Sequence, residues 1–273
     1  MSGDLDRLSL NQITTKSWTL PEAVDGCARW GLGWIGLWRD QVAAVGLDEA
    51  VGLLRRAGLA VSSLCRGGFF PSTDAGERDA RAADNRRAID EAAALGARVL
   101  VMVCGGIAGG GLDRSRGMVA EGIAELAPYA GERGVTLAIE PLHPMFCADR
   151  SVIVTLAQAL DLAEQFPAGQ VGVVVDTFHV WWDPTVEEQI ARAGGRIAAF
   201  QVCDWLDPLP DVLLGRGMMG DGPIDFRRLR RAVDRAGYRG PIEVEIFNAD
   251  VWASPGGEVL DRLVAAYRRH VLD

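Results

Sequence analysis

Short apolar segments rich in Val, Ile and Leu alternate along this chain with longer amphipathic segments. Strands that alternate with helices predict a parallel sheet. The apolar segments with the length and residue types of buried strands are 8–12, 34–37, 60–64, 98–103, 136–140, 172–176, 198–202 and 242–246. Between them, hydrophobic residues recur at helical spacing over 21–30, 48–57, 77–95, 119–133, 152–165 and 226–236.

Several of these helical segments run directly into a glycine and then into the next strand. Glycine accepts the left-handed conformation that closes a helix, so each of these glycines predicts a helix end. They are Gly58, Gly96, Gly134 and Gly237.

The number of strands points to a barrel. Eight strand–helix units in 273 residues give about 34 residues per unit, the usual size for a (β/α)8 barrel. The continuous apolar runs 99–103 and 171–175 fit strands buried on both faces. A doubly wound open sheet is the alternative, but no GxGxxG motif follows the first predicted strand. No linker interrupts the chain, so we predict an α/β fold, a single (β/α)8 TIM barrel, with residues 1–273 forming one domain.

Composition excludes several classes of partner. The net charge is −9, which disfavours nucleic acid because phosphate binding needs concentrated Lys and Arg. No apolar run of about 18 residues is present, so no membrane insertion is expected. The five cysteines are widely spaced without a CxxC motif, and the first residues are polar and charged. These features predict a reducing environment and a cytoplasmic location.

Carboxylates follow the late predicted strands at their C-terminal ends, where such barrels carry their chemistry. Glu140, Asp176 and Glu245 would repel one another there, and a shared divalent cation is the simplest arrangement that keeps them ionised. Gln201 would add a neutral oxygen, and an all-oxygen set favours manganese or magnesium over zinc. Each carboxylate alone has another interpretation, as a helix cap or an ion-pair partner. Glu243 lies one layer deeper, where we predict an ion pair.

Further candidates lie just beyond the strand ends. His179 and His143 each follow a candidate carboxylate by three residues, and Arg216 lies in a glycine-rich loop where it could hold a substrate oxygen or phosphate. Asp204 could orient a ligand or cap the next element. Aromatic residues that could form the wall of a sugar pocket include Trp38 and Trp205.

At these residues the sequence resembles the xylose isomerase-like TIM barrel superfamily. Within it, the likeness is to the sugar phosphate isomerase/epimerase family, which includes ketose 3-epimerases, inosose isomerases and dehydratases, and hydroxypyruvate isomerases. Its carriers are the segments 140–142, 176–179, 201–204, 216–222 and 243–247. The resemblance implies one divalent metal, manganese first and magnesium or cobalt as alternatives, on Glu140, Asp176, Gln201 and Glu245. It also implies His179 and Arg216 as substrate-binding groups, and Gln201 departs from the histidine that the family has there.

The resemblance further implies proton transfer beside a carbonyl of a small sugar or keto-polyol, through a metal-stabilised enediolate. One of Glu140 and Glu245 would take the proton from carbon, and the other would return one. Relatives often form dimers, so the resemblance also implies a homodimer. The first alternative is a lyase, a dehydratase or a 3-keto-glycoside-cleaving enzyme, in which His143 or His179 protonates the leaving group. A DNA-repair endonuclease needs a histidine-rich zinc site that three histidines cannot build. A non-catalytic sugar-binding barrel stays open because glutamine is the weaker ligand.

Overall fold

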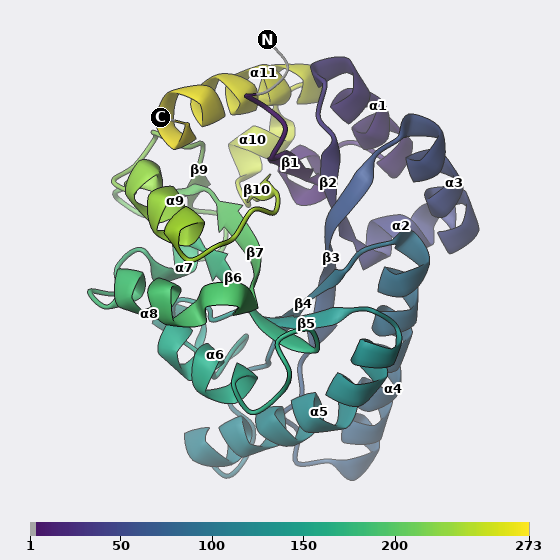
Figure 1. The fold of residues 1–273 in the computed structure, drawn as a ribbon, viewed down its shortest axis with the longest axis vertical. Coiled ribbons are helices and arrows are strands. Elements are labelled where there is room, and N and C mark those ends of the chain that lie inside the picture. The colour runs from purple at the N-terminus through teal and green to yellow at the C-terminus, as the bar shows by residue number, and fades with distance from the viewer. Residues whose placement is uncertain (1–3, 273) are drawn as a thin grey trace.

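The barrel predicted from the sequence is present. The computed structural model describes residues 4–272. Eight parallel strands close into one barrel in the order β1-β10-β7-β6-β5-β4-β3-β2, and the helices surround it (Figure 1). Two short strands, β8 (Asp204–Trp205) and β9 (Arg216–Gly217), form a separate antiparallel pair. The single (β/α)8 TIM barrel is therefore confirmed. The barrel strands are β1 (Leu8–Asn11), β2 (Trp34–Trp38), β3 (Ala60–Gly68), β4 (Val99–Val103), β5 (Thr136–Ile139), β6 (Val171–Asp176), β7 (Ile197–Val202) and β10 (Ile242–Val244).

Helices cover the outside of the barrel. They are α1 (Leu20–Trp30), α2 (Arg39–Val45), α3 (Leu47–Ala57), α4 (Ala75–Leu95), α5 (Leu112–Glu132), α6 (Leu156–Ala163), α7 (Thr177–Val180), α8 (Val186–Ala193), α9 (Phe226–Arg235), α10 (Ala249–Ala253) and α11 (Gly256–Ala266). The four glycines predicted to end helices all have positive φ, between 64° and 97°: Gly58, Gly96, Gly134 and Gly237. Within residues 4–272, no helix combines the length and the apolar content needed to cross a bilayer.

One predicted helix begins later than the sequence pattern suggests. The segment predicted as 152–165 stays non-helical until Thr155, whose side chain accepts a hydrogen bond from the Gln158 amide and caps α6. Val152 and Ile153 are buried although they precede the helix. Their hydrophobic character therefore reflects burial and not a helical conformation. An apolar stretch of this length does not by itself distinguish the two conformations.

Closure of the barrel aligns the polar residues of the late strands. The first barrel strand pairs with the last, so β1 and β10 lie side by side (Figure 1). Asp176 on β6 is in register with Gln201 on β7, which is in register with Glu243 on β10. Glu245 lies two residues further along the chain, toward the C-terminal mouth of the barrel. The fold therefore brings these polar side chains to one end of an otherwise apolar interior.

Candidate active site

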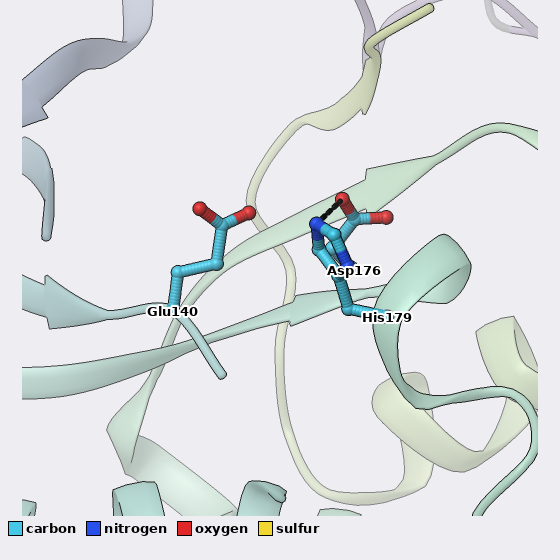
Figure 2. A group of neighbouring side chains, drawn as sticks. All are labelled: Glu140, Asp176 and His179. Atoms are coloured by element: carbon cyan, nitrogen blue, oxygen red, sulfur yellow. Dashed lines mark ion pairs between the residues drawn. The ribbon is translucent and has the colours of Figure 1, made fainter. Parts of the chain in front are cut away.

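Three acidic residues lie at the C-terminal ends of three barrel strands, as the sequence predicts. Glu140 directly follows β5, Asp176 ends β6, and Glu245 follows β10. All three are buried, with 5%, 1% and 4% of their surface exposed. Ligand atoms of Glu140, Asp176 and His179 lie within 4.8 Å of one another, and Figure 2 shows Glu140 facing the other two from its own strand end.

The imidazole of His179 lies beside Asp176. Its Nδ1 accepts a hydrogen bond of 3.1 Å from the backbone N–H of His143, and its Nε2 lies 3.6 Å from Asp176 Oδ2 (Figure 2). Burial, together with the charge of Arg216 and the neighbouring His143, lowers the pKa of His179 well below its usual value. The ring is therefore neutral, and because a fixed backbone N–H occupies Nδ1, we assign the proton to Nε2.

Arg216 links two of the carboxylates. Its Nη1 lies 3.1 Å from Asp176 Oδ2 and 2.8 Å from Glu245 Oε2, and the guanidinium is 5% exposed between two aromatic rings. Its Nη2 lies 3.2 Å from His179 Nε2. With the proton on Nε2, two donors converge there, close to the carboxylate of Asp176. Such a pair suits an oxygen atom of a ligand.

The carboxylates are unequally paired. Among residues 4–272, the Glu140 side chain has no hydrogen-bond partner, and burial, then the charges of Glu245 and Asp176, raise the pKa of Glu140 well above its usual value. Burial also raises the pKa of Glu245 to about 7, although Arg216 opposes the shift. Burial raises the pKa of Asp176, which Arg216 again opposes. Arg216 carries one positive charge against three carboxyl groups. These four side chains therefore have a net negative charge when the carboxyl groups are ionised.

Glu243 forms the floor of the site, and our prediction of an ion pair there is wrong. Its carboxylate accepts hydrogen bonds from Asn11 Nδ2 at 2.7 Å and from Gln201 Nε2 at 2.9 Å. The hydroxyl of Ser63 lies 2.9 Å from Glu243 Oε2, and the Ser62 hydroxyl also donates to it. Neutral donors from β1, β3 and β7 thus satisfy this buried charge, which the sequence pattern of one strand does not show.

The residues present fit a divalent cation. Gln201 donates a hydrogen bond from Nε2 to Glu243, but its buried Oε1 has no hydrogen-bond partner among residues 4–272, which is a rare state for a buried oxygen atom. The carboxylate of Glu140 is likewise free of hydrogen bonds within residues 4–272. Glu140 lies in one cluster with Asp176 and His179, whose possible ligand atoms, mainly oxygens, lie within 4.8 Å of one another. Hard or borderline divalent ions prefer such a set.

The substitution Gln201→His is expected to raise the affinity for Mn²⁺. The imidazole could donate one nitrogen to Glu243, as Gln201 does now, and present the other to a cation, an arrangement that orients metal-bound histidines in proteins. Equilibrium dialysis with Mn²⁺ measures the change. The control is Gln170→His. Gln170 lies just before β6, at the opposite end of that strand from Asp176. Unchanged or weaker binding in Gln201→His would mean that Gln201 is not a ligand.

A cavity of about 120 Å³ opens above these groups. Its wall includes Glu140, His179, Arg216, Glu245 and, among the predicted aromatic residues, Trp38. The indole Nε1 of Trp38 donates to Asn11 Oδ1 at 2.9 Å, which fixes the ring beside the cavity.

Two other predicted binding residues lie behind this wall. Trp205 stacks on Phe178 with ring centroids 4.9 Å apart, and the centroid of the His143 ring lies 5.0 Å from that of Trp205. The Nδ1 of His143 accepts from the Met145 amide. Their assignment to substrate binding stays a prediction, and their observed contacts support the residues that line the cavity.

Asp204 organises the loop that carries Arg216. Its Oδ2 accepts from the amides of Gly220 and Gly222, both at 2.9 Å, and its Oδ1 accepts from a third amide of the loop. A Cβ atom on Gly222 would lie 1.9 Å from the carbonyl oxygen of Trp205, so the loop needs glycine there. Asp204 also lies in β8 (Asp204–Trp205), which pairs with β9 (Arg216–Gly217). The function of Asp204, open from the sequence, is to hold this loop.

The family model for xylose isomerase-like TIM barrels matches residues 24–270. The chain belongs to this family. The resemblance seen in the sequence is thereby confirmed.

Two curated relatives differ in their activity. A 3-dehydroshikimate dehydratase of Pseudomonas aeruginosa is 30% identical over 161 residues, which are 57% of this chain and 24% of the relative. A ketose 3-epimerase of Arthrobacter globiformis is 27% identical over 149 residues, 54% of this chain and 45% of the relative. The chain therefore spans less than half the length of either relative. The family thus contains both epimerases and dehydratases.

Two solved structures cover nearly the whole chain. A crystal structure of a Sinorhizobium meliloti 1021 protein is 51% identical, with a TM-score of 0.95, over 97% of this chain and 98% of that one. The structure of the IolI protein, described with a bound zinc atom, is 20% identical with a TM-score of 0.86, over 97% of this chain and 98% of that one. The second likeness concerns the fold.

Proposed function

We propose that this protein is a divalent-metal-dependent isomerase or epimerase of a small sugar or keto-polyol. The observation that carries this proposal is the position of Glu140 and Glu245, two buried carboxyl groups that line one cavity at the barrel mouth. A carboxyl group whose pKa is raised toward neutrality is suited to take a proton from carbon and to return it. Burial does this for both residues.

Each glutamate has a distinct environment for this work. Glu140 has no hydrogen-bond partner within residues 4–272, so its carboxylate is free to approach a C–H bond of the substrate. Glu245 is held by Arg216 at 2.8 Å and by Asn11 at 3.1 Å, which fixes its orientation. One takes the proton and the other returns it, on the opposite face in an epimerisation. The handedness of the substrate decides which glutamate acts first.

The residues that would hold the cation are Glu140, Asp176, Gln201 and Glu245. A bound divalent ion supplies Lewis-acid polarisation of a carbonyl oxygen. Manganese is our first choice, with magnesium or cobalt as alternatives, because the donors are mainly oxygen atoms. The IolI protein, which shares this fold, is described with a bound zinc atom, which supports a divalent ion in a protein of this fold.

Other residues would bind and orient the substrate. His179 and Arg216 would donate hydrogen bonds to one substrate oxygen, since their Nε2 and Nη2 atoms converge. Trp38 would cover a face of the sugar, and His143 and Trp205 would act through the loops that they pack against. A single domain over residues 1–273, a cytoplasmic location and a homodimer remain part of the proposal.

A lyase acting by the same proton abstraction is the second candidate. The likeness to a 3-dehydroshikimate dehydratase favours it, although it covers 24% of that protein. His179 lies near Glu140, and its Nε2–H could donate a hydrogen bond to the oxygen of a leaving group. Elimination of water or an aglycone separates this reaction from isomerisation, which conserves mass.

Incorporation of solvent deuterium tests the proposal. We expect the protein with Mn²⁺ in D2O to exchange a hydrogen beside the carbonyl of a keto-sugar, an inosose or a keto-glycoside. NMR locates the exchanged carbon, and mass spectrometry distinguishes an isomer from an elimination product. The metal-free protein, prepared with a chelator, is the control. No exchange across the panel with Mn²⁺, Mg²⁺ or Co²⁺ would contradict the proposed function.

A further inference from the structure

Two arginines that the proposed chemistry does not use line the same cavity as Glu140 and Glu245. They are Arg66, near the end of β3, and Arg150, between β5 and α6. Arg66 is the extra residue of a bulge, because its neighbours Cys65 and Gly67 pair with the consecutive residues Val101 and Met102 of β4. Bulges next to active sites re-aim side chains. Here the residue at the bulge is Arg66, whose side chain lines the cavity.

Arg66 has no acidic partner. Its guanidinium lies over the Phe69 ring, 4.1 Å from the centroid, and it forms no hydrogen bond or ion pair with any residue from 4 to 272. Arg39, in the wall of an adjoining cavity, shows the contrast, since it binds Asp84 at 2.9 Å and Glu91 at 2.6 Å. Arg39 is therefore paired with carboxylates, whereas the guanidinium of Arg66 is available to bind a ligand.

Arg150 is also weakly paired. Its nearest carboxylate is that of the adjacent Asp149, at 3.9 Å, on a side chain that is 69% exposed. Burial lowers the pKa of Arg66, and the charges of Arg150 and Arg39 lower it further, while Cys65 and Glu140 oppose the shift. An arginine keeps its charge at neutral pH in any case. Two like charges thus lie near each other in a half-enclosed wall, an arrangement that an anion would stabilise.

We propose that Arg66 and Arg150 form a subsite for an anionic group of the substrate, a carboxylate or a phosphate. Arginine forks bind both groups through paired hydrogen bonds. This inference rests on the proposed function, because it places the anion on the molecule whose C–H bond faces Glu140 and Glu245. The substrate is then an acidic derivative of a sugar or keto-polyol.

The surrounding space accommodates such an extension. Arg66 also lines the adjoining cavity of about 530 Å³, which shares Trp38 and Cys65 with the smaller cavity. The carbonyl end of the substrate occupies the smaller cavity beside the glutamates. Its charged end lies at the boundary between the two cavities, where Arg66 can reach it.

Anion binding provides the first test. Isothermal titration of the protein with malonate and with inorganic phosphate measures both affinities. We expect Arg66→Gln and Arg150→Gln each to weaken binding of the preferred anion at least tenfold, and Arg114→Gln, which removes an exposed arginine on α5, to leave it unchanged. The anion that binds more tightly identifies the group as a carboxylate or a phosphate. Failure of both anions to bind, or equal binding by the variants, would overturn the subsite.

Deuterium exchange provides the second test and separates the two proposals. Fructose, fructose 6-phosphate and 5-ketogluconate are compared with Mn²⁺ present. We expect a lower KM for an acidic ketose than for fructose, and at least a tenfold rise of that KM in Arg66→Gln, with a smaller effect of this variant on the KM for fructose. Arg114→Gln is expected to leave both KM values unchanged. Exchange with fructose but no preference for an acid would overturn the subsite alone. Anion binding through both arginines with no exchange of any ketose would overturn the proposed function and leave the subsite standing.

Discussion

The substitutions Glu140→Gln and Glu245→Gln are each expected to lower kcat at least a thousandfold. A thousandfold loss corresponds to about 4 kcal/mol of transition-state stabilisation. An amide is nearly isosteric with a carboxyl group but cannot take a proton from carbon, and it is a weaker ligand for a cation. Deuterium wash-in with Mn²⁺ and a substrate found by the exchange panel measures the loss.

Stability separates a chemical effect from misfolding in these variants. Glu140 has no hydrogen-bond partner within residues 4–272 and a raised pKa, so Glu140→Gln is expected to keep or increase the Tm. Glu245→Gln loses an ion pair with Arg216 and is expected to lower it. Glu125→Gln, in an exposed pair with Arg86 on the outer helices, is the control for removal of a charge. Rates near wild type in either site variant would refute the assignment of proton transfer to these glutamates.

The substitution Arg216→Met is expected to destabilise the protein by about 3–5 kcal/mol, the usual cost of leaving buried charges without their partner. Arg216 is bonded to Asp176 and Glu245, both almost fully buried. Methionine keeps much of the apolar contact with Phe178 and Phe247 but removes the charge. Urea unfolding of the metal-free protein measures the difference in the free energy of unfolding.

Two comparisons sharpen this test. Arg216→Lys keeps a positive charge and is expected to lose less stability than Arg216→Met. Added Mn²⁺ is expected to raise the Tm of Arg216→Met more than that of the wild type, because the cation would neutralise the carboxylates that lack their arginine. A free energy of unfolding for Arg216→Met within about 0.5 kcal/mol of wild type, as for an ordinary surface substitution, would contradict the buried network.

Seven of the eight barrel strands could be predicted to within two residues at each end, because parallel strands buried on both faces are almost purely apolar. The exception is β3 (Ala60–Gly68), which extends four residues beyond its predicted end. Val171–Asp176 and Val99–Val103 differ from their predicted ranges by one residue at one end. The helix at 152–165 begins later than predicted because buried residues before it mimic helical spacing. Helix α8 (Val186–Ala193) was not predicted, although Pro184 and Thr185 precede a regular pattern that could have indicated it.

The site was predictable where it depends on the ends of strands. Glu140, Asp176 and Glu245 all lie at one mouth of the barrel because parallel strands end there, and Glu140 and Asp176 also cluster with His179. The partners of Glu243 were not predictable, because Asn11 and Ser63 come from strands far away in the sequence and their contacts depend on barrel closure. Arg66 was not among the residues predicted from the sequence, because it lies in a β-bulge that the sequence does not reveal. In the sequence it is only a charged residue before Gly67 and Gly68.

The hydrogen bonds of Glu243 bear on any attempt to redesign this protein. They join β1, β3, β7 and β10 through Asn11, Ser63 and Gln201, and Asn11 also contacts Glu245. A mutation at one of these positions therefore alters the surroundings of the others, so their effects should be strongly epistatic. New specificities in this scaffold are more accessible through the wall residues and loops than through the floor, which an engineer would have to exchange as a unit.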